Sequence, residues 1–183
     1  MGDLPTRTRR LFFALWPAPA LRRAIEHDTR ALARRSGGRI VPARNFHVTL
    51  AFLGSVAESR LADLVRAGGA ARAPRFELSL DRVQTLPRAN VLCLAPSVTP
   101  IELRRLVDAL RVALEAEGFE LERRPFRPHL TLVRRLNRPM PTLPLPPVVW
   151  PVEEFVLVES RTAAAGSEYE VLARWPLWTQ DAL

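Results

Sequence analysis

The chain has 183 residues, and its 48% hydrophobic and 25% charged content is typical of a globular domain, which excludes a disordered or fibrous protein. No stretch approaches the ~20 consecutive apolar residues of a membrane-spanning helix. The net charge is +8 and all 27 basic residues are arginine; this favours an anionic partner, although a solvated basic surface without a partner explains the charge equally well.

The N-terminal segment imitates a secretory signal peptide, because basic residues at 7–10 precede the short apolar run LFFALWPAPA. Pro17 and Pro19 interrupt this run, so we expect instead a strand at 10–16, followed by a helix from Pro19 to about Ser36. The protein is accordingly expected to be cytoplasmic.

The next segments predict a strand and a second helix. A short extended piece at 40–41 leads to the run FHVTLAFL, which is typical of a strand and ends at Gly54. Ser55 and Glu58 form an S-x-x-E pattern, which predicts a capping box at the start of a helix. The apolar residues of this helix, which stops near Gly68-Gly69, are Leu61, Leu64 and Val65.

Two further strands are predicted at 76–83 and 90–95, joined through Pro87. The second of these strands contains Cys93 in the apolar run VLCLA, where we expect a buried and unreactive thiol. One cysteine cannot form an internal disulfide, which fits a reducing compartment.

A third helix is predicted by Thr99 and Glu102, which repeat the capping pattern with Pro100 at the first helical position. The helix is expected to end at Gly118. Its apolar residues recur at helical spacing and form one stripe: Leu103, Leu106, Val107, Leu110, Ala113 and Leu114.

The segment from Pro139 to Pro151 shows neither helical nor strand periodicity, and we expect an exposed proline-rich connector there. Final strands are expected at about 152–159 and 169–177.

Two strands that carry histidine, FHVTLAFL and PHLTLVRR, each follow a long amphipathic helix, so the chain has two related halves. We infer an α+β fold in which antiparallel sheets backed by helices bring these strands together across a central cleft.

The histidine-containing strands carry the same tripeptide pattern, HVT at 47–49 and HLT at 129–131, and use two of the three histidines of the chain. Side chains two residues apart on a strand point to the same face. Each motif therefore presents an imidazole beside a hydroxyl, while Val48 and Leu130 face a core. A single His-x-Thr is a weak motif, but two in equivalent positions are hard to explain by packing alone.

These residue types suit acid–base chemistry at phosphorus. Imidazole titrates near neutral pH, so one of His47 and His129 can accept a proton while the other donates one in an in-line displacement. Thr49 and Thr131 can donate hydrogen bonds to non-bridging phosphate oxygens, and Arg134 can add positive charge.

Other site chemistries are disfavoured. The third histidine, His27, lies among charged residues of the first helix and is expected to be solvated. A metal site is not expected, because His47 and His129 lack the nearby Cys, His or carboxylate companions that zinc recruits. No phosphate-binding glycine loop or dinucleotide fingerprint is present in the sequence.

The pair HVTL and HLTL resembles the tandem HxTx signature of the 2H phosphoesterase superfamily. Its surroundings, RLFFALWP, ARNFHVTLAFLG, RPFRPHLTLVRR and LVESRTAAAGSEYEVLARWPL, are similar to the bacterial and archaeal RNA 2′,3′-cyclic phosphodiesterases, also called 2′-5′ RNA ligases. The resemblance covers nearly the whole chain. It implies a two-lobed 2H phosphoesterase fold with pseudo-twofold symmetry, in a single catalytic domain that spans residues 1–183.

The resemblance also implies an activity: opening of a 2′,3′-cyclic phosphate at an RNA end to a 2′-phosphate, without metal or cofactor. By position, His47 would donate a proton to the leaving 3′ oxygen and His129 would activate water. Thr49, Thr131 and Arg134 would hold the phosphate oxygens. The residue pattern by itself treats the two histidines as equivalent, so this division of roles rests on the resemblance. In the reverse direction, a ribose 5′-hydroxyl in place of water would give a 2′-5′ RNA link.

Two alternatives stay open. The first is a 2H phosphoesterase for another small cyclic or 2′-5′ linked nucleotide; aromatic side chains near the cleft would favour nucleotides, but Phe13, Phe46 and Phe126 are all expected in the core. The second is a non-catalytic RNA-binding protein that uses its arginine-rich surface. In every case we expect a monomer that does not associate with membranes.

Overall fold

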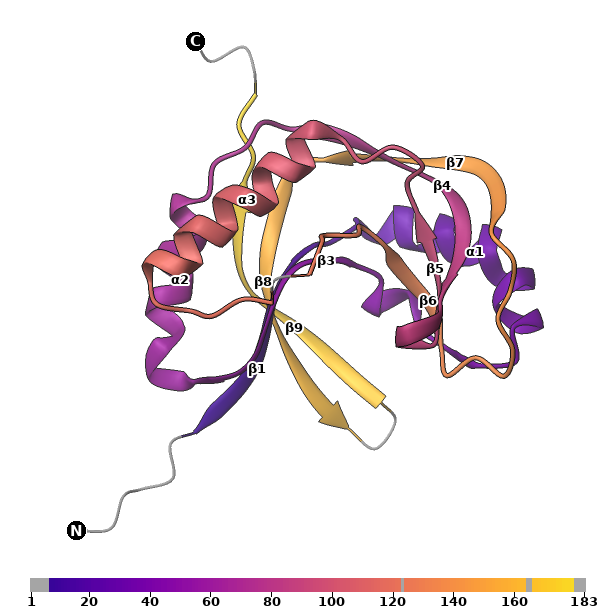
Figure 1. Cartoon of the computed structure of the whole chain (residues 1–183), viewed down its shortest axis with the longest axis horizontal. Helices are drawn as coiled ribbons and strands as arrows, with labels where there is room; N and C mark the ends of the chain where they lie inside the picture. Colours follow the sequence, from indigo (N-terminus) through magenta and orange to yellow (C-terminus); the bar gives the residue numbers. More distant parts are fainter. Residues whose placement is uncertain (1–6, 123, 164–165, 180–183) are drawn as a thin grey trace.

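The computed structural model describes residues 7–122, 124–163 and 166–179 (Figure 1). The strands are β1 (Thr8–Leu15), β2 (Arg39–Ile40), β3 (Val48–Ala57), β4 (Phe76–Leu86), β5 (Val91–Ala95), β6 (Leu130–Arg134), β7 (Leu143–Val152), β8 (Glu154–Ala163) and β9 (Gly166–Pro176). The helices are α1 (Pro19–Arg35), α2 (Leu61–Ala70) and α3 (Ile101–Ala116), with 3-10 turns η1 (Ala43–Asn45), η2 (Glu58–Arg60) and η3 (Pro87–Ala89).

The strands of the described residues form one antiparallel sheet in the order β7-β4-β5-β6-β3-β1-β8-β9, with β2 paired to β6. The sheet has two matching halves of four strands each. Counted outward from the centre, one half contains β3, β1, β8 and β9, and the other contains β6, β5, β4 and β7. A helical connection leads from β1 to β3 in one half and from β5 to β6 in the other. The α+β prediction with antiparallel strands and approximate twofold symmetry is thus confirmed. The two halves meet at the pairing of Val48 with Leu130, and β2 adds two further pairs with β6 across the same junction.

All three helices contribute to one buried core cluster, which also holds Val48 and Leu130. Helix α1 packs against β6 and α3 packs against β3, so each helix covers the motif strand of the opposite half (Figure 1). The apolar stripe predicted for α3 is confirmed, with four of its leucines fully buried: Leu103, Leu106, Leu110 and Leu114. Each half therefore depends on a helix of the other half to cover its sheet.

Both predicted capping boxes are wrong. Ser55 lies inside β3, paired with Arg10 of β1, because β3 continues past Gly54 to Ala57. Helix α2 begins only after η2, and the N-cap of α3 is Pro100. At these two helix starts, the described residues provide no side-chain cap. Strand pairing satisfies the backbone at Ser55, so the local capping signal is overridden there.

The predicted proline-rich connector is also wrong, because most of this segment is strand β7, paired with β4 at the edge of the sheet. An edge strand uses only one side of its backbone for the ladder, so prolines such as Pro144 and Pro151 are tolerated. Trp150 is 4% exposed and Val152 is 1% exposed, so these side chains attach the strand to the core.

Replacing Trp150 with alanine should therefore lower the free energy of unfolding by ~3–5 kcal/mol, because a large buried side chain leaves a cavity. Urea unfolding followed by circular dichroism measures this. The matched control is Trp178→Ala, whose side chain is 42% exposed and which should cost clearly less. Equally small effects of the two substitutions would contradict the burial of β7.

Candidate active site

The central strand pair positions both motifs. Val48 and Leu130 lie opposite each other and are both 0% exposed. Continuing this antiparallel register by one residue places His47 across from Thr131, and Thr49 across from His129. Because side chains alternate along a strand, the four polar side chains share the face opposite the core. His47 and His129 each lie one residue before their strand, at the point where the ladder begins.

The two histidines are oriented in the same way. His47 Nδ1 lies 2.7 Å from the carbonyl oxygen of Asn45, and His129 Nδ1 lies 2.7 Å from that of Arg127. A carbonyl oxygen can only accept, so Nδ1 carries the hydrogen in both rings. Nε2 is left on each ring as the nitrogen that can take up or release a proton.

The surroundings of the two rings differ. His47 contacts three aromatic rings: Phe12 at 4.9 Å between centroids, Trp16 stacked at 5.7 Å, and Tyr169 edge-on at 5.2 Å. No aromatic contact is found for His129 among the residues that the structure describes. Sequence reasoning missed these three residues, because they come from β1, the residue after it, and β9, far from the motif in the chain. The aromatic run RLFFALW was the available signal.

Burial is the main cause that lowers the pKa of His47, to about 4, and the positive charges of Arg134 and Arg22 and the neighbouring His129 lower it further. The hydrogen bond to the carbonyl of Asn45 acts in the opposite direction, because it favours the protonated ring. In the free protein, His47 is therefore neutral at pH 7.

A cleft of about 810 Å³ opens beside His47, and Thr49 and Arg134 also line it. His129 and Thr131 are not among the described residues that line this cleft. They are placed beside it by the pairing of their strand with that of His47 and Thr49. Glu168 is the acidic residue of the lining, which is otherwise rich in arginine: Arg10, Arg39, Arg44, Arg124, Arg134 and Arg135. The excess of positive charge favours an anionic ligand.

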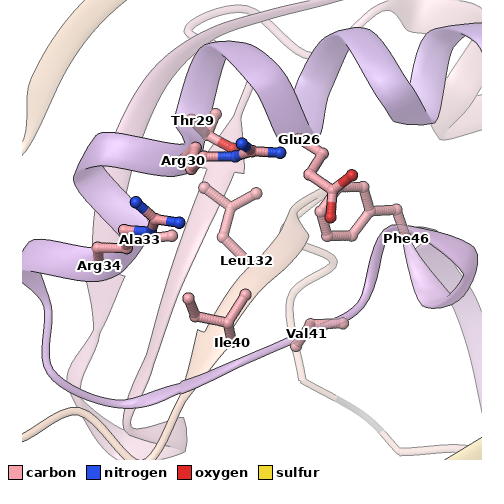
Figure 2. A pocket seen from close by; sticks show the side chains of 9 residues that line it. All are labelled: Glu26, Thr29, Arg30, Ala33, Arg34, Ile40, Val41, Phe46 and Leu132. Carbon is pink, nitrogen blue, oxygen red and sulfur yellow. The ribbon is translucent and has the colours of Figure 1, made fainter.

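A second cavity, of about 290 Å³, lies under helix α1 (Figure 2). Arg30 and Arg34 project from the helix on one side, Ile40 lies on the other, and Leu132 stands between them (Figure 2). No histidine or threonine of the two motifs lines this cavity, although Ile40 and Val41 border both it and the cleft beside His47.

The sequence predictions on the burial of five other residues agree with the structure. Phe13 and Phe46 are buried in the core and Phe126 packs against it. Cys93 is buried, which raises the pKa of its thiol to about 12. The side chain of His27 is 86% exposed.

Two kinds of feature are not found. The described residues hold no group of three or more His, Cys, Asp or Glu side chains placed to bind a metal ion. The helices of the described ranges include none long and apolar enough to cross a membrane.

The chain is similar to known proteins over most of its length. A family model described as the 2′-5′ RNA ligase superfamily matches residues 17–164, which include both motifs. Identity to the RNA 2′,3′-cyclic phosphodiesterase of Escherichia coli is 36% over 171 residues, covering 92% of this chain and 97% of the relative. Identity to the protein of the same name from Thermus thermophilus is 32% over 182 residues, covering 92% and 90%.

The fold is similar as well. The crystal structure of E. coli LigT complexed with 3′-AMP matches with a TM-score of 0.86 and 34% identity, covering 93% of this chain and 99% of that one.

The environment of His47 predicts an unusual titration. In the free protein its ring should protonate only near pH 4, and inorganic phosphate in the cleft should raise this pKa, because a nearby anion favours the charged ring. Arg134→Gln should raise it as well, since a positive charge is removed. Long-range ¹H–¹⁵N NMR over a pH series measures both effects, and His47→Gln identifies the signal. Titration near pH 6.5 in the free protein would contradict the burial argument.

Proposed function

This chain belongs to the 2′-5′ RNA ligase superfamily, and we propose that it opens the 2′,3′-cyclic phosphodiester at an RNA end to a 2′-phosphomonoester with His47 and His129 as acid and base. The observation that carries the proposal is the equal anchoring of the two imidazoles through Nδ1, beside an arginine-lined cleft. Two such rings can act on opposite sides of one phosphorus.

In the proposed reaction, Nε2 of His129 takes a proton from water as the water oxygen attacks phosphorus. The bond from phosphorus to the 3′ oxygen breaks, and that oxygen receives a proton from Nε2 of His47. Thr49 and Thr131 donate hydrogen bonds to the non-bridging oxygens, and Arg134 balances their negative charge. The product is a 2′-phosphate, and solvent restores the two protonation states.

The unequal surroundings support this division of roles. The leaving 3′ oxygen remains attached to the ribose, so the nucleoside lies on the side of the proton donor. The aromatic wall of Phe12, Trp16 and Tyr169 lies around His47 and suits a nucleoside. Attacking water must arrive from the opposite side.

Because the pKa of His47 is low, its protonation depends on substrate binding. A ring that is neutral in the free protein cannot donate at neutral pH. The negative charge of the cyclic phosphate raises the pKa of an adjacent imidazole, so His47 gains its proton together with the substrate. The same site with a 5′-hydroxyl in place of water would form a 2′-5′ RNA link.

We also propose the domain organisation, oligomeric state and compartment of the enzyme. It is a single catalytic domain over residues 1–183 that works as a monomer in the cytoplasm, which suits a buried Cys93. It requires no metal or cofactor, because two imidazoles and a guanidinium supply the acid, the base and the positive charge.

The first test is the reaction itself. Pure protein incubated with a nucleoside 2′,3′-cyclic phosphate in excess EDTA should give the nucleoside 2′-phosphate, identified by ³¹P NMR. Formation of the 3′-phosphate would reassign the leaving oxygen. Loss of turnover in EDTA would overturn the metal-independent mechanism, and RNA binding without any turnover would favour the non-catalytic alternative.

The second test concerns the two histidines. His47→Ala and His129→Ala should each lower kcat by ~10²–10⁴-fold, because each removes a proton-transfer group. The matched control is His27→Ala, which alters an exposed histidine outside the cleft and should leave turnover unchanged. Circular dichroism confirms that each variant is folded. Near-normal rates in both motif variants would refute two-histidine catalysis.

A further inference from the structure

A β-bulge brings an additional aromatic residue to the face that carries the motif. The register of β3 against β1 shifts between Thr49 and Ala51. Simple alternation would turn Phe52, three residues beyond Thr49, to the opposite face of the sheet. With the bulge, Phe52 is instead paired with Phe12, whose ring contacts His47. Bulges commonly re-aim a side chain in this way next to active sites.

Phe52 is exposed where an aromatic residue would ordinarily be buried. Its side chain is 47% exposed, and the guanidinium of Arg10 lies 4.7 Å from the ring centroid. Arg10 is itself exposed and pairs across β1 and β8 with Ser160. All three side chains line the same cleft as His47.

Phe52 and Arg10 lie at a distance from the residues proposed to bind the phosphate. The partners of Thr49 and Phe52 on β1, Ala14 and Phe12, are two residues apart, so at ~3.3 Å per residue Phe52 lies roughly 7 Å from Thr49 along the sheet. A cyclic phosphate held by Thr49 cannot reach Phe52 as well. The outer part of the cleft therefore faces a different part of the substrate.

We propose that Phe52 and Arg10 form a subsite for the nucleotide that precedes the cyclic-phosphate end of an RNA chain. The exposed part of the Phe52 ring stacks on the base, and Arg10 contacts the phosphodiester that joins this nucleotide to the terminal one. Stacking on an aromatic ring accepts any base, so the subsite selects for chain length rather than sequence. This inference rests on the proposed function and adds to it a preference for RNA over mononucleotides.

The test compares kcat/KM for a nucleoside 2′,3′-cyclic phosphate with that for a trinucleotide ending in the same group. Phe52→Ala should lower the value for the trinucleotide by about 5- to 100-fold, the range of one lost stacking contact, and leave the mononucleotide value unchanged. Phe52→Trp should retain the preference for the trinucleotide. Arg10→Gln should lower the trinucleotide value and weaken its dependence on salt, since one phosphate contact is lost.

Matched controls separate the subsite from general surface effects. Val112→Ala removes an exposed apolar side chain on α3, and Arg105→Gln removes an exposed arginine on the same helix; neither should change the preference for the trinucleotide. If Phe52→Ala lowers kcat/KM equally for both substrates, or for neither, the subsite is refuted while the proposed function stands. If the wild type turns over neither substrate, the proposed function fails and the subsite fails with it.

Discussion

The pairing of Val48 with Leu130 joins the two halves of the sheet, and both side chains are buried in the core to which all three helices contribute. Because successive side chains on a strand point to opposite faces, burying these two forces the neighbouring His and Thr residues to the other face. Core packing and site geometry are thus one constraint. A slip of one residue in this register would turn the imidazoles into the core and the apolar side chains into the cleft.

Around this joint, the backbone is nearly symmetric and the environment is not. Each imidazole donates from Nδ1 to the carbonyl oxygen two residues earlier. Yet only one ring of the described site, that of His47, is enclosed by aromatic residues, and its pKa is lowered by burial and by the positive charge of Arg134. Such an asymmetry suits a substrate whose two sides differ, a nucleoside on one side and water on the other. In the proposed reaction, an anion that binds in the arginine-rich cleft raises the pKa of His47, so this ring gains its proton when the substrate binds.

Where local sequence signals failed, a contact from a distant part of the chain had overridden them. Ser55 carries a capping signal, but its backbone is already paired with Arg10 of β1. Pro144 and its neighbours argue against a strand, but β4 offers an open edge and Trp150 attaches β7 to the core. Periodicity succeeded where an element is long and its apolar face is regular, as in α3.

The sequence by itself determined the fold class, the two related halves and the repeated His-x-Thr motifs, because periodicity and motif spacing are local properties of the chain. It also indicated the family, through the segments around both motifs. Only the tertiary structure decided which groups surround each histidine: Tyr169 reaches His47 through the pairing of β9, β8, β1 and β3. A bulge in β3, invisible to simple alternation, turned Phe52 into the cleft. The physical reason is that burial, charge and strand register arise from contacts between residues far apart in the chain.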